Sequence, residues 1–175
     1  MKRLLFLAMA GLLVLPVRGQ SAEEDLATIR NYVKVSDELA TSGQIAYDQI
    51  ASLAELGYDV VVNLATASES ANALEGYMVV EAGMTYVHIP VSWGEPSMRD
   101  LEMFFDVMEM NEDRKVFVHC FANMRASAFT YLYRTLVQGV SEEEAKKAMD
   151  PVWDPMELEQ WADLIERAQA EHKTD

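Results

Sequence analysis

The sequence predicts an α/β fold, a three-layer sandwich in which helices cover both faces of a mainly parallel sheet. Segments with the apolar spacing of helices alternate along the chain with short, largely apolar runs at 60–62, 85–89 and 115–119. Such runs are typical of strands buried on both faces, as the strands of a parallel sheet are. The chain has 175 residues, half of them hydrophobic, which is enough for one domain with its own core.

The expected helices lie between these runs, and glycine marks several of their ends. The first, at 47–56, places its apolar residues on one face and ends before Gly57. Ser141, followed three residues later by Glu144, has the spacing of a capping box and predicts the start of a helix that ends at Met149. The other helices are expected at 70–82 and 125–137, each followed by a glycine, and at 98–110 and 156–170.

The first 19 residues have the layout of a secretory signal peptide. Lys2 and Arg3 precede an apolar run at 4–15, which is followed by Pro16 and by a small residue, Gly19, at the expected cleavage site. The run is shorter than the roughly 20 apolar residues that a bilayer span needs. We therefore expect a periplasmic or secreted protein, with no stable membrane insertion after cleavage.

After the signal peptide at 1–19, the sequence divides into an acidic lead-in at 20–32, one folded domain at 33–170 and a tail at 171–175. A short helix is expected at 25–32, within the lead-in. No long linker, low-complexity tract or internal repeat indicates a second domain. The residues that carry the chemistry are therefore expected within the folded domain.

The chain is acidic, with a formal net charge of −15 at pH 7. Such a surface repels polyanions, so we expect no nucleic-acid partner, because that binding depends on phosphate neutralisation by Lys and Arg. The same field favours small substrates over highly anionic ones. No grouping of Cys, His, Asp and Glu has the spacing of metal ligands, so neither a metal nor another cofactor is expected. The sequence leaves the oligomeric state open.

The only cysteine, Cys120, lies in the most informative stretch, VFVHCFANMRASAF at 116–129. It follows an expected buried strand and precedes an expected helix. At such a junction, unpaired backbone N–H groups and the positive end of the helix dipole favour thiolate over thiol and can bind an oxyanion. Arg125 adds a planar fork of donors for two oxygens of an anion. Further contacts with substrate are expected from Phe121, Ala122, Asn123, Met124 and Ser127.

This stretch resembles the signature of the cysteine-based protein phosphatases, in which His-Cys is followed by a loop, by Arg and then by Ser or Thr. More closely, the sequence is similar to the bacterial dual-specificity and tyrosine-phosphatase-like domain that is also found fused to β-lactamase-like hydrolases. The similarity covers about 33–154 and includes the segments SGQI, GYDVVVNLA, YVHIPV and VHCFANMRASAF. It implies that SGQI belongs to an edge strand, that Cys120 is the nucleophile, and that Arg125 binds phosphate. His119, which precedes Cys120, is expected to fix the loop by hydrogen bonding rather than to act as a base.

The loop between Cys120 and Arg125 departs from the phosphatase signature, because it has four residues instead of five. If the loop keeps the longer form, Ala126 takes the place of the arginine. If the loop is shorter, Arg125 is the anion ligand, and the smaller ring of N–H groups resembles that of rhodanese sulfurtransferases and suits a persulfide sulfur. Asn123 stands where many phosphatases have glycine, and asparagine tolerates the left-handed backbone better than most residues do.

The loop after the YVHIPV segment departs from the signature as well. In phosphatases it usually carries an aspartic acid that protonates the leaving group, whereas here it reads Ser92, Trp93, Gly94, Glu95, Pro96. Trp93 stands at the usual position of the acid, and Glu95 is the nearest carboxyl group on the loop. We therefore expect Glu95 to act as the general acid. Loss of a general acid typically slows a reaction by about 100- to 10,000-fold.

Together these residues predict a cysteine-dependent phosphatase-like hydrolase that cleaves a phosphoester through a thiophosphate intermediate on Cys120. Its expected partner is a small phosphorylated or sulfur-bearing substrate, or a phosphopeptide. Two alternatives stay open. The four-residue loop favours a rhodanese-like sulfurtransferase that carries a persulfide on Cys120, and the missing aspartic acid favours an anion-binding module with weak or no turnover.

Overall fold

The computed structural model describes residues 21–67 and 73–172, and over them it has the α/β architecture that the sequence predicts. The five strands of its sheet have the order β1-β2-β5-β3-β4. β1 pairs antiparallel with β2, and the other pairs are parallel. The expected signal peptide and residues 20, 68–72 and 173–175 lie outside the described residues. The strands are β1 (Val33–Lys34), β2 (Leu39–Ser42), β3 (Val60–Asn63), β4 (Thr85–His88) and β5 (Val116–His119).

The three apolar runs of the sequence form β3, β4 and β5, so the predicted strands and fold class are confirmed. The expectation that the SGQI segment belongs to an edge strand is wrong. Ser42, its first residue, ends β2, which lies inside the sheet because Val33 and Lys34 of β1 pair with Thr41 and Ala40 on its outer side. A strand of two residues has no periodicity by which the sequence could reveal it.

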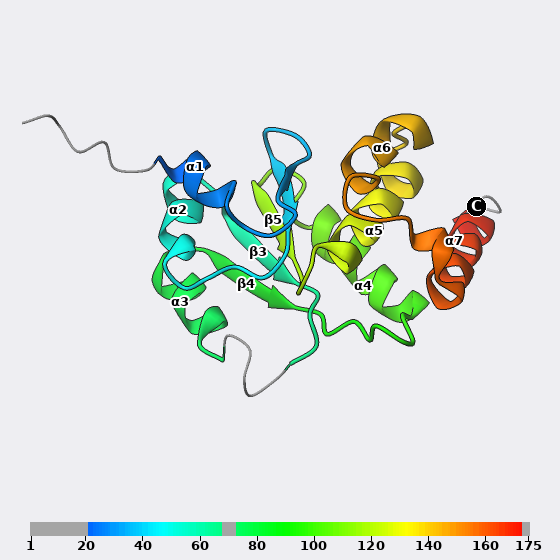
Figure 1. The fold of residues 1–175 in the computed structure, drawn as a ribbon, viewed down its shortest axis with the longest axis horizontal. Helices are drawn as coiled ribbons and strands as arrows, with labels where there is room; N and C mark the ends of the chain where they lie inside the picture. Colours follow the sequence, from blue (N-terminus) through cyan, green and yellow to red (C-terminus); the bar gives the residue numbers. More distant parts are fainter. Residues whose placement is uncertain (1–20, 68–72, 173–175) are drawn as a thin grey trace, which may run out of the picture.

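Helices cover both faces of the sheet (Figure 1). One face carries α1 (Ala22–Leu26), α2 (Gln49–Glu55) and α3 (Glu75–Glu81). Within the described ranges, no helix combines the length and the apolar character that crossing a bilayer requires. The other face carries α4 (Met98–Glu109), α5 (Met124–Leu132), the π-helical turn η1 (Tyr133–Val137), α6 (Glu142–Met149), the 3-10 turn η2 (Pro155–Glu157) and α7 (Glu159–His172).

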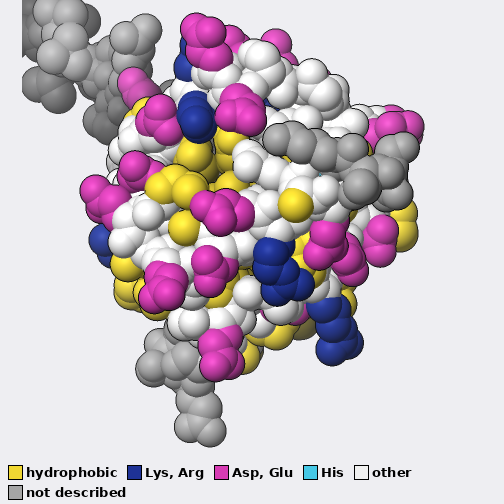
Figure 2. All heavy atoms as spheres, turned by 90° about the vertical axis from the view of Figure 1, so that its right-hand side faces the viewer, with side chains coloured by type: hydrophobic (Ala, Val, Ile, Leu, Met, Phe, Trp, Pro, Cys, Tyr) yellow, Lys and Arg dark blue, Asp and Glu magenta, His cyan; other side chains and the backbone are white. Residues whose placement is uncertain are grey.

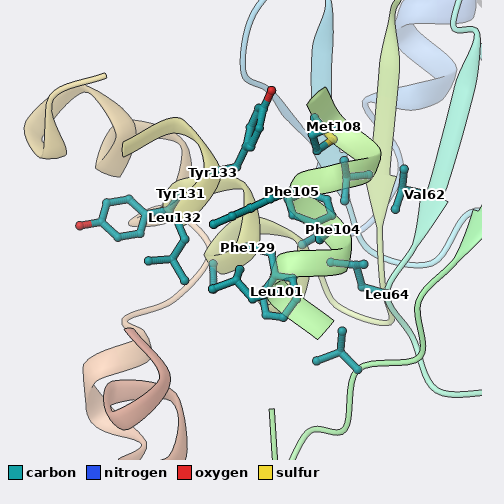
Figure 3. Close-up of a cluster of buried hydrophobic side chains, with 14 of the residues drawn as sticks. Val62, Leu64, Leu101, Phe104, Phe105, Met108, Phe129, Tyr131, Leu132 and Tyr133 are labelled. Carbon is teal, nitrogen blue, oxygen red and sulfur yellow. The ribbon is translucent and has the colours of Figure 1, made fainter. Parts of the chain in front are cut away.

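The central strands bury side chains on both faces of the sheet. Val61 and Phe117 belong to a smaller apolar cluster under α1, α2 and α3. The intervening residues of the same strands belong to a larger cluster under α4, α5 and α7, as Figure 3 shows in part. There the ring of Phe104 lies 5.7 Å from that of Phe129 and 6.3 Å from that of Tyr133, measured between centroids. Burial on both faces accounts for the continuous apolar runs.

Several helix ends follow the sequence prediction. Gly57, Gly83 and Gly139 follow α2, α3 and η1 with φ angles of 78°, 87° and 67°, in the left-handed region that glycine adopts without strain. The hydroxyl of Ser141 accepts the backbone N–H of Glu144 and caps α6, as predicted. The helix expected at 125–137 is present as α5 continued by η1.

The helix of the lead-in begins and ends earlier than the predicted 25–32. It is α1, which begins at Ala22 because Ser21 and Glu24 form a reciprocal capping box. Leu26 and Ile29 are buried in the smaller apolar cluster. The lead-in therefore packs against the sheet layer and comes close to the loop that follows β5.

Candidate active site

Cys120 lies directly after β5, the central strand of the sheet, where the chain turns toward α5. Its backbone N–H donates to the carbonyl oxygen of Ser42, which ends the neighbouring strand β2 (3.2 Å). The side chain is almost fully buried, with 1% of its surface exposed. The cysteine thus has the strand-to-helix setting that the sequence predicts, where the first N–H groups of a helix lack intrahelical acceptors.

The loop at 121–123 ends in a left-handed residue. Asn123 has a φ angle of 67° and is the N-cap of α5, so the asparagine does adopt the backbone expected of it. Its buried amide donates to the carbonyl oxygen of Asn31 (2.6 Å) and to Oγ1 of Thr41 (3.0 Å). The amide of Asn31 donates in turn to the carbonyl oxygen of Ala122 (3.0 Å). These two asparagines hold the loop from its inner side.

Gly43 allows three backbone segments to meet beside this loop. Its N–H donates to the carbonyl oxygen of Arg30 (2.8 Å), and the N–H of Gln44 donates to that of Phe121 (3.2 Å). A Cβ atom at Gly43 would lie 2.8 Å from the carbonyl oxygen of Arg30 and 3.1 Å from that of Phe121. Only a residue without a side chain fits there, so the lead-in, β2 and the loop are packed as one unit.

Arg125 lies in the first turn of α5 and faces the same cavity as Cys120. Its Nη1 donates to the carbonyl oxygen of Val91, in the loop after β4 (2.9 Å). Its Nε is buried and has no hydrogen-bond partner among the described residues. Ala126 is fully buried and does not line the cavity. Of the two residues that the sequence allowed, the geometry therefore places Arg125, and not Ala126, in the cavity of Cys120.

The cavity that Cys120 and Arg125 share has a volume of about 260 Å³. At its mouth lie Phe121 and Trp93, with 61% and 37% of their surface exposed. Ala122 and Met124 complete the lining. The cavity thus combines a thiol, one guanidinium and walls that are otherwise apolar, an arrangement suited to a compact anion attached to an apolar group.

The loop after β4 brings Trp93, and not Glu95, to this cavity. Glu95 is exposed, its backbone N–H donates to Oγ of Ser92 (3.2 Å), and it is not among the residues that line the cavity. Trp93 is held by packing on Trp153 and Trp161, with ring centroids 5.4 Å away in both cases. The indole N–H of Trp161 also donates to the carbonyl oxygen of Trp93 (3.2 Å).

Ser127 holds the start of α5. Its hydroxyl donates to the carbonyl oxygen of Met124 (3.1 Å) and accepts the indole N–H of Trp153 (3.2 Å), which also donates to Met124 (2.9 Å). The hydroxyl of Ser127 is therefore engaged within the protein, and these hydrogen bonds do not direct it toward a substrate. No sequence signal marked Trp153, because its role depends on a contact between distant segments.

His119 is fully buried on the inner side of the loop, away from the cavity lining. Its Nε2 lies 2.9 Å from Oε1 of Glu75, a carboxylate of α3 that is itself buried. Tyr86 also donates to this carboxylate (3.0 Å), and burial raises the pKa of Tyr86 far above its usual range, so the phenol keeps its proton. Sequence analysis missed Glu75, because nothing distinguishes it from the solvated glutamates of other helices.

A larger cavity, of about 550 Å³, lies between α5, α6 and α7. Figure 2 views this side of the molecule and shows acidic side chains spread over it with apolar ones between them. The described residues that line it include Glu142, Asp150 and Asp154 and neither Cys nor His. Over 21–67 and 73–172, no group of three His, Cys, Asp or Glu residues is placed to hold a metal ion. The candidate active site is therefore the smaller cavity at Cys120.

Comparison with known proteins agrees with this geometry. A family model described as a DSP-PTPase phosphatase fused to NAD+ kinase matches residues 16–164. The crystal structure of a candidate phosphatase (DUF442) from Shewanella putrefaciens is 37% identical, covers 85% of this chain and 97% of its own, and has a TM-score of 0.76. TpbA of P. aeruginosa is 17% identical, covers 85% of this chain and 91% of its own, and shares the fold with a TM-score of 0.66. None of the curated proteins matches the chain.

Proposed function

The chain belongs to the family of DSP-PTPase phosphatase domains, and from this premise we propose that it is a cysteine-dependent phosphatase. The family is described by its fusion to NAD+ kinase, whereas the resemblance of the sequence is to a domain fused to β-lactamase-like hydrolases. The phosphatase-like domain is common to both. The family match therefore establishes the fold and the family, and the reaction at Cys120 is what we propose.

One observation carries the proposal: Cys120 and Arg125 line one cavity at the start of α5, beside the carboxyl end of the central strand. A thiolate at this position is stabilised by the helix N-terminus and by the nearby guanidinium. The same groups bind the oxygens of a phosphoryl group, and Arg125 has a buried Nε without a partner among the described residues. Nucleophile and anion ligand therefore face a single bound group.

The reaction proceeds in two steps. In the first, Sγ of Cys120 attacks phosphorus, the bond from phosphorus to the ester oxygen breaks, and the leaving group departs with the bonding electron pair. Arg125 and the N–H groups at the start of α5 stabilise the charge on the transferring oxygens. In the second step, water attacks the phosphorus of the thiophosphate and loses a proton to solvent or to a nearby base. The bond between phosphorus and Sγ breaks, which releases inorganic phosphate and returns Cys120 to the thiolate.

The substrate we propose is an aryl phosphomonoester, either a small molecule or a short phosphotyrosine peptide. Among the described residues, no Asp or Glu lines the cavity, so the reaction favours leaving groups that depart without a general acid. Phe121 and Trp93 at the mouth offer ring faces to an aromatic leaving group. TpbA, which has the same fold, has been solved in complex with phosphotyrosine.

The experiment that tests this function compares two reactions on the same purified protein. We expect release of phosphate from p-nitrophenyl phosphate and from a phosphotyrosine peptide, and little transfer of sulfur from thiosulfate to cyanide. Cys120→Ser should lower the phosphatase rate by roughly 1,000-fold or more, because it removes the nucleophile. Sulfur transfer without phosphatase activity would instead establish the sulfurtransferase alternative, and binding of phosphate without either reaction would establish the anion-binding module.

A further inference from the structure

All three tryptophans of the chain meet in one cluster beside the candidate active site. The ring of Trp93, in the loop after β4, lies 5.4 Å from that of Trp153 and 5.4 Å from that of Trp161, measured between centroids. The rings of Trp153 and Trp161 are 5.5 Å apart. Aromatic rings attract one another over such separations, so each member of this tryptophan cluster packs on the other two.

Two members of the tryptophan cluster are anchored by their indole N–H groups. Trp161, in α7, is fully buried, and its N–H donates to the carbonyl oxygen of Trp93 (3.2 Å). Trp153, between α6 and η2, donates to the carbonyl oxygen of Met124 (2.9 Å) and to Oγ of Ser127 (3.2 Å), both in the first turn of α5. The cluster therefore connects the loop after β4 to the start of α5.

The loop that carries Trp93 has few other anchors. The backbone N–H of Val91 donates to the carbonyl oxygen of Leu64 (3.3 Å), and its own carbonyl oxygen accepts Nη1 of Arg125 (2.9 Å). Beyond this point, no backbone-to-backbone hydrogen bond within the described ranges involves residues 92–96. The ring of Trp93 is also partly exposed. Its position therefore depends on the two indoles on which it packs.

Trp93 and Trp153 face different cavities. Trp93 lines the cavity of Cys120 and Arg125, so an aryl group attached to a bound phosphate would meet its ring. Trp153 is half-buried and lines the larger cavity between α5, α6 and α7 instead. A ring that is already held in place binds a ligand better than one that must be ordered on binding, because ordering costs side-chain entropy. Trp153 can therefore act on an aryl group through Trp93.

We propose that Trp153 is a positioning residue, which holds Trp93 as a preformed wall for the aryl group of the substrate. The inference rests on the proposed function for the class of substrate, but its effect on binding does not require turnover. Phosphate itself is held by Arg125 and by the N–H groups at the start of α5, so its binding should not depend on this wall. A residue that only stabilises the fold would not separate the two ligands in protein that remains folded.

The test compares the binding of phenylphosphonate and of inorganic phosphate to the full chain by titration calorimetry. Phenylphosphonate joins carbon directly to phosphorus, so it has no ester bond to cleave, and wild type should bind it more tightly than phosphate. In Trp153→Leu we expect the affinity for phenylphosphonate to fall roughly three- to tenfold, with that for phosphate within about twofold. Trp153→Phe keeps a ring against Trp93 and should restore most of the preference. Met156→Ala, at an exposed position of the same segment, is the matched control and should match wild type.

Fluorescence gives a second measurement that needs no ligand. Since all three tryptophans lie in the cluster, the emission of the protein reports on it alone. Trp153→Phe and Trp153→Leu lack the same fluorophore, but only the leucine variant removes the ring beside Trp93. We expect its emission to be shifted to the red of that of Trp153→Phe, because Trp93 becomes more exposed to water. Identical emission from the two variants would mean that this ring does not hold Trp93, contrary to the proposal.

A double variant establishes the route. Trp93→Ala removes the wall and should by itself abolish the preference for phenylphosphonate, and Trp153→Leu added to it should change that affinity by less than about 1.5-fold. Equal weakening of both ligands in Trp153→Leu, or a full additional loss in the double variant, would overturn the proposal. Trp93→Ala with the wild-type preference would do so as well, even if Trp153→Leu did not fold.

The same titrations separate this proposal from the proposed function. A wild type that prefers phenylphosphonate but does not hydrolyse p-nitrophenyl phosphate would count against the phosphatase and leave the role of Trp153 intact. A wild type that hydrolyses p-nitrophenyl phosphate without preferring phenylphosphonate to phosphate would do the reverse. Failure to bind either ligand would count against both.

Discussion

The inner side and the mouth of the candidate active site are built in contrasting ways. On the inner side, Asn123 is bonded to the lead-in and to β2, and His119 is bonded to a buried carboxylate. At the mouth, Phe121 and Trp93 are partly exposed and present rings to solvent. The inner side therefore fixes the loop that holds the sulfur, while in the proposed reaction the rings at the mouth would meet the leaving group. Substitutions in the two regions should therefore affect stability and turnover differently.

Among the residues around Cys120, the largest effect is expected at Arg125, where the two regions meet. In Arg125→Lys a point charge replaces the planar fork and cannot hold two phosphate oxygens and the carbonyl oxygen of Val91 together. We expect kcat/KM for p-nitrophenyl phosphate to fall by more than about tenfold, with the unfolding temperature little changed. Equal turnover by Arg125→Lys and wild type would mean that the backbone N–H groups alone hold the anion.

A smaller effect on rate, with a clear effect on stability, is expected on the inner side. Asn123→Ala loses two hydrogen bonds and keeps a left-handed backbone that alanine disfavours, so the free energy of unfolding should fall by about 1–3 kcal/mol. Asn123→Gly relieves the backbone strain but not the lost bonds, and should recover part of the loss. Urea unfolding of the two variants measures the difference. If both match wild type, the paired asparagines do not hold the loop.

The smallest effect is expected at the mouth, from Glu95→Gln. Glu95 is exposed and outside the cavity lining, so we expect less than about threefold change in turnover of either p-nitrophenyl phosphate or phenyl phosphate. The comparison of the two substrates is the informative measurement, since a general acid matters most for the poorer leaving group. A loss of about 100-fold confined to phenyl phosphate would show that Glu95 reaches the leaving group during the reaction.

The sequence allowed the sheet and the position of Cys120 between a buried strand and a helix to be predicted, because both depend on local patterns. The apolar runs that became β3, β4 and β5 reflect burial on two faces, and the spacing of Cys120 and Arg125 reflects a turn between one strand and one helix. The two-residue strand β1 could not be foreseen, because it is too short to have a period. The choice between Arg125 and Ala126 also required the geometry, since the loop length alone allowed both.

The supporting residues were missed for a different reason. Glu75 contacts His119, which lies 44 positions away in the chain, and Asn31 contacts Asn123, which lies 92 positions away. No local pattern marks such contacts. Glu75 is the first residue of the short helix α3, and only the packing of α3 on the sheet buries it. Trp153 likewise gains its role from contact with Trp93 and with the start of α5. Tertiary contacts, not propensity, determine these roles.

The most direct test of the account is to trap the intermediate on Cys120. Wild-type protein mixed with p-nitrophenyl phosphate and quenched with acid within the first turnover should carry one phosphoryl group, and peptide mapping should place it on Cys120. Cys120→Ser should carry none on this peptide under the same conditions. Turnover with no phosphoryl group on Cys120, or a sulfur atom on Cys120 after thiosulfate with no phosphoryl transfer at all, would contradict the assignment of this cysteine as a phosphatase nucleophile.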